Sequence, residues 1–258
     1  MDIVIMTFNL RYDNASDGIN SWTNRIGKIV HILEQTQPAV IGTQELLPTM
    51  ITDFARRLPD YDWFGKPRRS NDEHSAIFFR KDMFRVINSG TFWLSKTPSI
   101  EGSSSWNSSL PRICTWGEFH CLDQPNKFRV FNTHLDHMSK EARVNGVRVI
   151  KQYMDTLNRE DYLPHMLMGD FNAYPNSEEV RFWQEDPQFT SVFSTMDRHE
   201  TLRKTFHDFE GGYQGEPIDY IFVSKTAQIK SGSIIYSKVD NMYPSDHYPV
   251  CARINIPV

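Results

Sequence analysis

The sequence predicts an α/β protein with a single domain over residues 1–258. Composition is the first observation: 39% of the 258 residues are hydrophobic and 23% are charged. These fractions are typical of soluble globular proteins and exclude disordered or membrane-spanning chains. A strand–helix–strand order also occurs once in each half of the chain, as in α/β folds. Finally, no long Pro-, Gly- or Ser-rich linker divides the sequence, so one domain accounts for its length.

The first half of the chain begins with a predicted strand and helix. Residues 3–10 form an apolar, partly β-branched run that favours a strand. A helix is predicted over about residues 21–35, because Ile26, Ile29, Val30 and Leu33 recur at helical spacing. The remaining elements are a short helix over residues 50–58 and strands over residues 39–43, 75–80, 91–94 and 113–120. The polar stretch 96–107 is predicted to be a surface loop.

The second half repeats this order around a longer helix. That helix is predicted over about residues 140–158, where Val147, Ile150, Met154 and Leu157 are spaced by three and four. A shorter helix is expected over residues 177–185, and the glycine-rich stretch 210–217 is expected to be a loop. Apolar runs predict strands over residues 128–134, 165–169, 218–223, 232–236 and 249–256.

Charge and cysteine content exclude several classes of protein. The chain has 28 Lys and Arg against 32 Asp and Glu, a net charge of −4, which argues against long non-specific contacts with nucleic acid. Cys114, Cys121 and Cys251 contain no CxxC pair, so neither a disulfide framework nor a cysteine zinc site is expected. His134 and His137 form an HxxH pair, but no third ligand accompanies it at a suitable spacing, which favours a loop role.

The ends of the chain and its hydropathy give expectations about location and partners. The N-terminus starts acidic and lacks a signal-peptide pattern, and no apolar run reaches 18 residues. We therefore expect a cytoplasmic protein without a membrane span, with a processed secreted form as the alternative. Nothing in the sequence implies an obligate protein partner.

Polar side chains follow the predicted strands at their ends. They are Asn9, Glu45, His134, Asp136, Asp170, Asn172, Asp219, Asp246 and His247. Because open α/β architectures place ligand sites at the carboxyl ends of strands, these residues are expected to share one rim.

This set of residues suits hydrolysis of a phosphate ester. Mg²⁺ takes oxygen ligands and needs only one or two protein carboxylates, a task for Glu45. Asp170 can activate water, and the Asn172 amide can contact a phosphoryl oxygen. His134 and His247 can donate to phosphate if they are protonated, and an adjacent carboxylate would raise the pKa of either ring.

The strand ends belong to short motifs that, in chain order, are TFNLR, TQE, NTHLD, GDFN, PIDYIF and SDHYPV. As an ordered set they resemble the endonuclease/exonuclease/phosphatase superfamily, which has the deoxyribonuclease-I-like fold. The resemblance runs from Thr7 to Val250. It implies a four-layer α/β/β/α sandwich, in which two mostly antiparallel sheets pack face to face, helices lie outside and the site lies at one end.

The resemblance also implies metal ligands. Glu45 matches the family's Mg²⁺ ligand, and Asn9 matches the asparagine that supports the metal shell and the phosphate. Asp246 matches a carboxylate next to the metal, bound directly or through water. The expected cofactor is Mg²⁺, with Mn²⁺ as a substitute.

Catalytic roles are implied for five further residues. Asp170 matches the aspartate that aligns or deprotonates the attacking water, and Asn172 matches its phosphate-binding neighbour. His247 matches the histidine at the scissile phosphate, and Asp219 the carboxylate that orients it. His134 matches a histidine that some branches of the family use at the phosphate.

Candidates for substrate contacts lie close to these motifs. Arg112 and Asp136 are expected at the rim, and Arg143 lies on the helix that follows Asp136. Trp106, in the polar loop, can stack on a base or sugar.

Two other groups are given structural roles. Trp93 and Trp116 are expected in the core or as loop anchors. The basic residues between positions 66 and 81 alternate with Asp72, Glu73 and Asp82, which is typical of a solvated face.

Together these features predict a hydrolase of the nuclease or phosphatase type, a Mg²⁺-dependent phosphohydrolase. It would cleave a phosphodiester or phosphomonoester by metal-assisted, in-line attack of water. The alternative is a catalytically silent module of the same fold that binds a phosphorylated ligand, but none of the expected carboxylates is missing. The expected substrate is a phosphorylated small molecule or a short nucleic acid, without a stable nucleic-acid complex.

Overall fold

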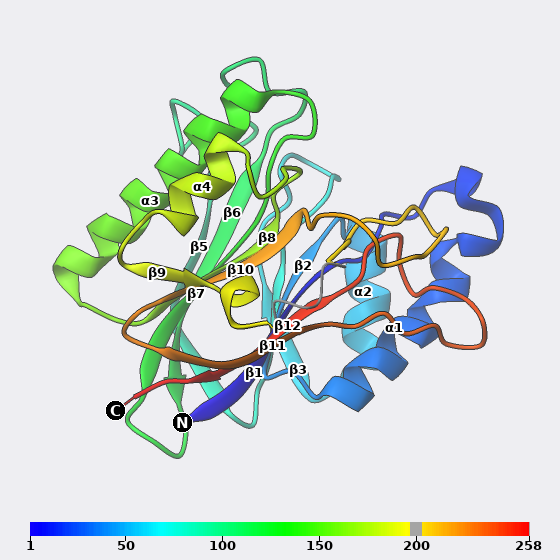
Figure 1. Ribbon diagram of the computed structural model, residues 1–258, viewed down its shortest axis with the longest axis horizontal. Coiled ribbons are helices and arrows are strands. Elements are labelled where there is room, and N and C mark those ends of the chain that lie inside the picture. The colour runs from blue at the N-terminus through cyan, green and yellow to red at the C-terminus, as the bar shows by residue number, and fades with distance from the viewer. Residues whose placement is uncertain (197–202, 258) are drawn as a thin grey trace.

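The computed structural model describes residues 1–196 and 203–257, and in these residues the strands form two six-stranded sheets that face each other (Figure 1). In spatial order, the first sheet contains β11 (Gln228–Ile234), β12 (Val250–Asn255), β1 (Asp2–Asn9), β2 (Val40–Gln44), β4 (Ile77–Arg80) and β3 (Tyr61–Phe64). The second contains β5 (Phe84–Trp93), β6 (Ile113–Cys121), β7 (Lys127–His134), β8 (His165–Asp170), β10 (Asp219–Ser224) and β9 (Phe189–Ser191). Each sheet has one parallel pair, β1–β2 or β7–β8, among antiparallel neighbours.

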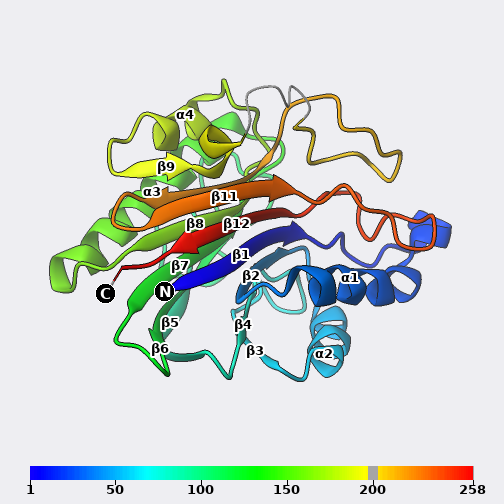
Figure 2. The same cartoon turned by 60° about the horizontal axis from the view of Figure 1, so that its bottom comes forward.

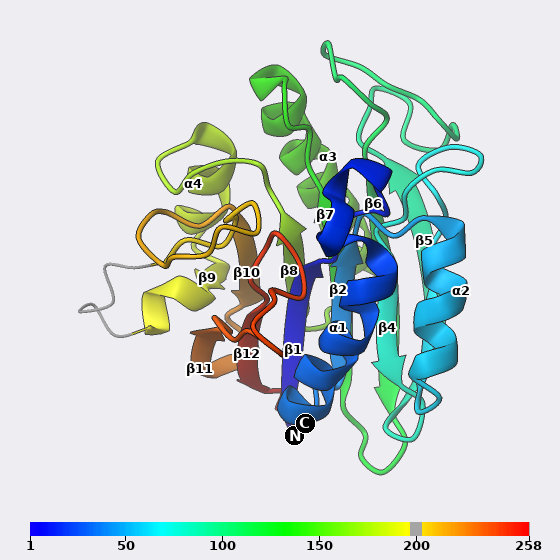
Figure 3. The ribbon, with the colours of Figure 1, turned by 90° about the vertical axis from the view of Figure 1, so that its right-hand side faces the viewer.

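Helices cover the two outer faces of this pair of sheets (Figure 3). They are α1 (Trp22–Thr36) and α2 (Pro48–Arg57) on the first sheet, and α3 (Lys140–Glu160) and α4 (Glu178–Gln184) on the second. Short 3-10 helices, η1 (Ala15–Asn20) and η2 (Val192–Thr195), lie in the connections. This arrangement confirms the expected four-layer sandwich. No helix in the described ranges is long and apolar enough to cross a membrane.

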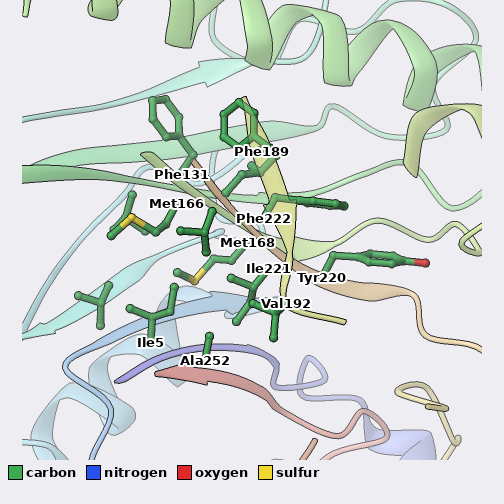
Figure 4. Packing of buried hydrophobic residues seen from close by; sticks show 14 of the residues in the cluster. Ile5, Phe131, Met166, Met168, Phe189, Val192, Tyr220, Ile221, Phe222 and Ala252 are labelled. Carbon is green, nitrogen blue, oxygen red and sulfur yellow. The ribbon is translucent and has the colours of Figure 1, made fainter. Parts of the chain in front are cut away.

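Apolar side chains fill the space between the sheets (Figure 4). Ile5 and Ala252 from the first sheet face Met168 and Ile221 from the second, and all four are buried. Removing this apolar surface from water is the main favourable term that holds the sheets together. Trp93 and Trp116 are also buried, as expected.

Alternation along the strands decides which side chains reach the site. In β1, Met6 and Phe8 belong to the cluster under α1 and α2, whereas Ile3 and Ile5 belong to the core between the sheets. Because strand side chains alternate between faces, Asn9 lies on the same face of β1 as Ile5 and projects towards the second sheet. By the same alternation, His134 at the end of β7 and Asp170 at the end of β8 project towards the first sheet.

One end of the sandwich collects the functional strand ends. β1, β2, β7 and β8 end there, and β10 and β12, which run antiparallel to β8 and β1, begin there. The chain termini lie at the opposite end of β1 and β12 (Figure 2). Chain direction alone therefore brings together the residues at the ends of β1, β2, β7 and β8 and those at the beginnings of β10 and β12.

Four strands differ clearly from the sequence prediction. β3 and β9 were not predicted, because β3 lies at a sheet edge and is only half-buried, and β9 has only three residues. β5 starts at Phe84 rather than residue 91, since its first part is largely exposed and contains a bulge between Val86 and Asn88. β11 covers Gln228–Ile234 rather than residues 232–236.

Candidate active site

Three adjacent strands of the second sheet place a row of polar side chains at the site. His134 of β7 and Asp219 of β10 both pair in register with Asp170 of β8. Asn9 reaches this row from the first sheet: its Nδ2 donates to Asp170 Oδ2 at 3.0 Å and to Glu45 Oε1 at 2.9 Å. The two sheets are thus joined by hydrogen bonds where the site forms.

Gly169 allows Asp170 to take this position. Its φ of +150° is strained for any residue with a side chain, and a Cβ there would lie 2.0 Å from the carbonyl oxygen of Thr133 in β7. The glycine of the GDFN motif therefore permits the backbone path and the close approach to β7 that bring Asp170 beside His134.

Glu45 and Asp246 are the carboxylates at the cavity that could hold a cation through oxygen atoms. Glu45 accepts the Nδ2 bond of Asn9 at Oε1 and the backbone N–H of Tyr12 at Oε2, at 3.0 Å. Burial and the nearby charge of Glu45 raise the pKa of Asp246, although the charges of His247 and of Arg11, whose Nε lies 3.7 Å from Asp246 Oδ2, act in the opposite direction. An all-oxygen donor set fits Mg²⁺ or Mn²⁺.

A second group of possible ligands fits a cation less well. Ligand atoms of Asp170, Asp219 and His247 lie within 4.8 Å of one another. However, Nδ1 of His247 is hydrogen-bonded to Asp219 Oδ2 at 2.9 Å. Burial opposes the charged ring, but the charge of Asp219 and this hydrogen bond outweigh burial and raise the pKa of His247 well above its usual value. A protonated imidazole has no lone pair for a metal, so this group is better described as a charge pair beside Asp170.

Asp170 has the properties of a general base. Burial, together with the charge of Asp219, raises its pKa to about 7, while hydrogen bonds from Asn9 and the Asn172 backbone stabilise its charged form. A carboxyl group that titrates near neutral pH can accept a proton efficiently.

His134 is held as a neutral imidazole, which differs from the protonated donor considered from the sequence. Burial and the charge of Arg112 lower the pKa of His134 well below its usual value. Its Nε2 lies 3.0 Å from Asn172 Nδ2, which also donates to the Leu135 carbonyl at 3.1 Å. With both amide hydrogens used in this way, Asn172 positions His134.

These residues border a cavity of about 740 Å³, the volume of a small-molecule site. It is lined by Arg11, Tyr12, Asp13, Glu45, Leu47, Arg68, Asp72, Glu73, Leu110, Arg112, His134, His137, Asp170, Asn172, Phe206, Ile218, Asp246 and His247. Asn9 and Asp219 lie directly behind the lining and hydrogen-bond to it.

Three of the predicted substrate contacts lie outside the lining. Asp136 accepts bonds from Ser109 and Ser139; burial opposes its charge, but these bonds lower its pKa to about 2, so it organises the loops behind Arg112. Arg143 pairs with buried Glu179 and donates to the Asp136 carbonyl at 3.0 Å. Trp106 is tied by its carbonyl oxygen to Ser139. Of the four candidates, only Arg112 borders the cavity.

Several cavity residues could not be found from the sequence. Arg68, expected on a solvated face, is only 6% exposed and pairs with Asp72 and Glu73. Phe206 and His137 also line the cavity. All of them lie in connections without a repeating pattern, so their burial depends on tertiary contacts that spacing does not reveal.

Comparisons with known proteins agree with this geometry. The model of the Endonuclease/Exonuclease/phosphatase family matches residues 6–247. A crystal structure of a protein of this family from Bacteroides thetaiotaomicron is 31% identical, with a TM-score of 0.92 over 100% of this chain and 99% of that one. A mannosyl-6-phosphatase from the same organism is 32% identical, with a TM-score of 0.91 over 98% of this chain and 99% of that one.

More distant structures share the fold alone. The catalytic domain of human nocturnin is 19% identical, with a TM-score of 0.77 over 99% of this chain and 94% of that one.

A search of curated proteins found no match. Because the family model spans nearly the entire sequence and the similar structures cover it almost completely, the chain belongs to the Endonuclease/Exonuclease/phosphatase family of phosphoester hydrolases.

Proposed function

We propose that the protein is a divalent-cation-dependent phosphomonoesterase whose substrate is a small phosphorylated metabolite, a sugar phosphate in particular. The observation that carries this proposal is the 740 Å³ cavity, in which Asp170, His247 and Glu45 meet. Its size suits a sugar phosphate better than a nucleic-acid track. The mannosyl-6-phosphatase that is 32% identical supports the same substrate class.

The residues have distinct tasks in this reaction. Asp170 accepts the proton of the attacking water, and Asn9 orients the carboxylate through its 3.0 Å bond. His247, kept protonated by Asp219, donates from Nε2 to a phosphoryl oxygen, because Nδ1 is engaged by Asp219. Arg112 supplies further positive charge beside His134.

Glu45 and Asp246 would hold the Mg²⁺ or Mn²⁺ ion, with Asn9 in support. Such an ion, when bound, neutralises charge on the phosphoryl oxygens. A phosphomonoester dianion gains more than a diester monoanion from a site that also contains the protonated His247.

A substrate panel tests this function. Purified protein with Mg²⁺ or Mn²⁺ is incubated with hexose phosphates, inositol phosphates, nucleoside monophosphates, phospholipids, bis(p-nitrophenyl) phosphate and short oligonucleotides. We expect phosphate release from small monoesters and little cleavage of diesters. Glu45→Gln should abolish release, whereas Glu101→Gln, at an exposed loop position, should not change it.

Two outcomes would contradict the proposal. Cleavage of diesters in preference to every monoester would overturn the monoesterase assignment. Absence of any hydrolysis, together with absence of Mn²⁺ binding by calorimetry, would favour a silent binding module.

A further inference from the structure

Phe206 places an aromatic ring in the cavity wall beside the phosphate-binding histidine. The side chain is 41% exposed although it lines the cavity. Its ring centroid is 5.0 Å from that of His247, with 55° between the planes. The two residues also form an antiparallel β-bridge. A large apolar ring is therefore open to whatever is bonded to the phosphate at His247.

Backbone hydrogen bonds fix this ring relative to the site. On one side of Phe206, the Thr205 carbonyl oxygen accepts a hydrogen bond from Tyr248 N at 2.7 Å. The Thr205 hydroxyl oxygen accepts one from Asp219 N at 3.2 Å. On the other side, His207 N donates to the Asp246 carbonyl at 2.8 Å. The segment is thus bonded to the residues that carry Asp219 and His247, which makes Phe206 a preformed part of the site.

We propose that Phe206 is the platform on which the ring of the sugar that carries the phosphate packs, and that it determines substrate specificity. This inference rests on the proposed function. A sugar ring has an apolar C–H face that can cover an aromatic ring and a rim of hydroxyl groups that needs polar partners. The cavity offers both, since Asp13, Asp72 and Arg68 also line it.

The short separation from His247 favours a sugar over a nucleobase. In a nucleotide the ribose is bonded to the phosphate, and the base is one sugar further away. A platform 5.0 Å from the ring that contacts the phosphate therefore meets the group that carries the phosphate directly.

Kinetics with two kinds of substrate test the platform. The kinetics of the protein and its variants are compared with a hexose 6-phosphate and with ethyl phosphate, whose organic group has no ring to cover the Phe206 side chain. For Phe206→Ala we expect KM for the hexose phosphate to rise about tenfold, with a much smaller loss in kcat/KM for ethyl phosphate. Phe206→Leu should behave like Phe206→Ala, and Phe206→Tyr should retain the wild-type KM. Tyr162→Ala, at an exposed position that does not line the cavity, is the matched control.

The following outcomes would contradict the proposed role of Phe206 as a sugar platform. Equal losses with both substrates would mean that Phe206 only shields His247. Unchanged kinetics with the hexose phosphate, or a greater loss with nucleoside monophosphates, would exclude a sugar platform. Wild-type protein that hydrolyses ethyl phosphate but no hexose phosphate refutes the platform while leaving the phosphomonoesterase intact, and hydrolysis of neither refutes both.

Discussion

Replacing Asp219 with Asn removes the negative charge beside His247 and changes the size of the side chain very little. Asp219 Oδ2 lies 2.9 Å from His247 Nδ1, and both residues are at least 95% buried. Water therefore cannot take the place of the Asp219 carboxylate in stabilising the charged imidazole ring of His247. In the variant, only the charges of Asp170 and Asp246 still oppose the effect of burial, so we expect the pKa of His247 to fall.

The magnitude follows from the burial of this pair. Truncating one partner of a buried, hydrogen-bonded charge pair costs about 2–5 kcal/mol. If His247 contributes its charge in the transition state, kcat/KM should fall about 30- to 5,000-fold, at about 1.4 kcal/mol for each factor of ten. A value near the upper end is expected, because His247 is only 5% exposed.

The pH profile should move as well. Activity that needs protonated His247 is lost as pH rises through its pKa, so a lower pKa moves this alkaline limb to lower pH. Burial and, in second place, the charge of Asp219 raise the pKa of Asp170 to about 7, so the acid limb should move in the same direction when that charge is removed.

The assay is kcat/KM for a hexose phosphate between pH 5 and 9, for wild type, Asp219→Asn and the exposed control Asp123→Asn. An Asp219→Asn variant with the wild-type rate would refute the role of the pair. A lower rate with an unmoved pH profile would refute the electrostatic part of the reasoning and leave Asp219 only an orienting role.

Three other predictions concern the metal, the backbone and the acid limit of stability. Mn²⁺ should raise the melting temperature of wild-type protein but not of Glu45→Gln, and an equal rise in both would exclude Glu45 as a ligand. Gly169→Ala should lower the free energy of unfolding by at least about 3 kcal/mol in urea titrations, because its Cβ would meet the Thr133 carbonyl oxygen at 2.0 Å; wild-type stability would contradict this. Burial lowers the pKa of His165 to about 3, so stability should fall as pH drops from 6.5 towards 3. His165→Phe should reduce this fall in urea titrations at pH 4 and 7, and an unchanged fall would assign it to other groups.

The sequence predicts those site residues whose positions follow from side-chain alternation and chain direction alone. Asn9, Asp170 and Asp219 lie at strand ends, so their convergence follows from which strands meet at one end of the sandwich. The two long helices, α1 and α3, follow from a repeating apolar face, which must be buried.

The remaining cavity residues depend on contacts between distant loops. Phe206 is placed by hydrogen bonds from its neighbours to residues 246 and 248, about 40 positions later, which no local pattern signals. Arg143 and Trp106 illustrate the opposite error. Both lie close to site motifs in sequence, yet their observed partners, Glu179 and Ser139, are structural.

The most direct test of the account is phosphate release from a hexose phosphate by wild type and Asp170→Asn, at saturating Mn²⁺ and neutral pH. Asn keeps the shape of the side chain but cannot accept the proton of the attacking water. We predict metal-dependent release by the wild type and a loss of at least about 100-fold in the variant. A folded Asp170→Asn protein that retains a rate within tenfold of wild type would contradict the central claim that Asp170 activates water at this site.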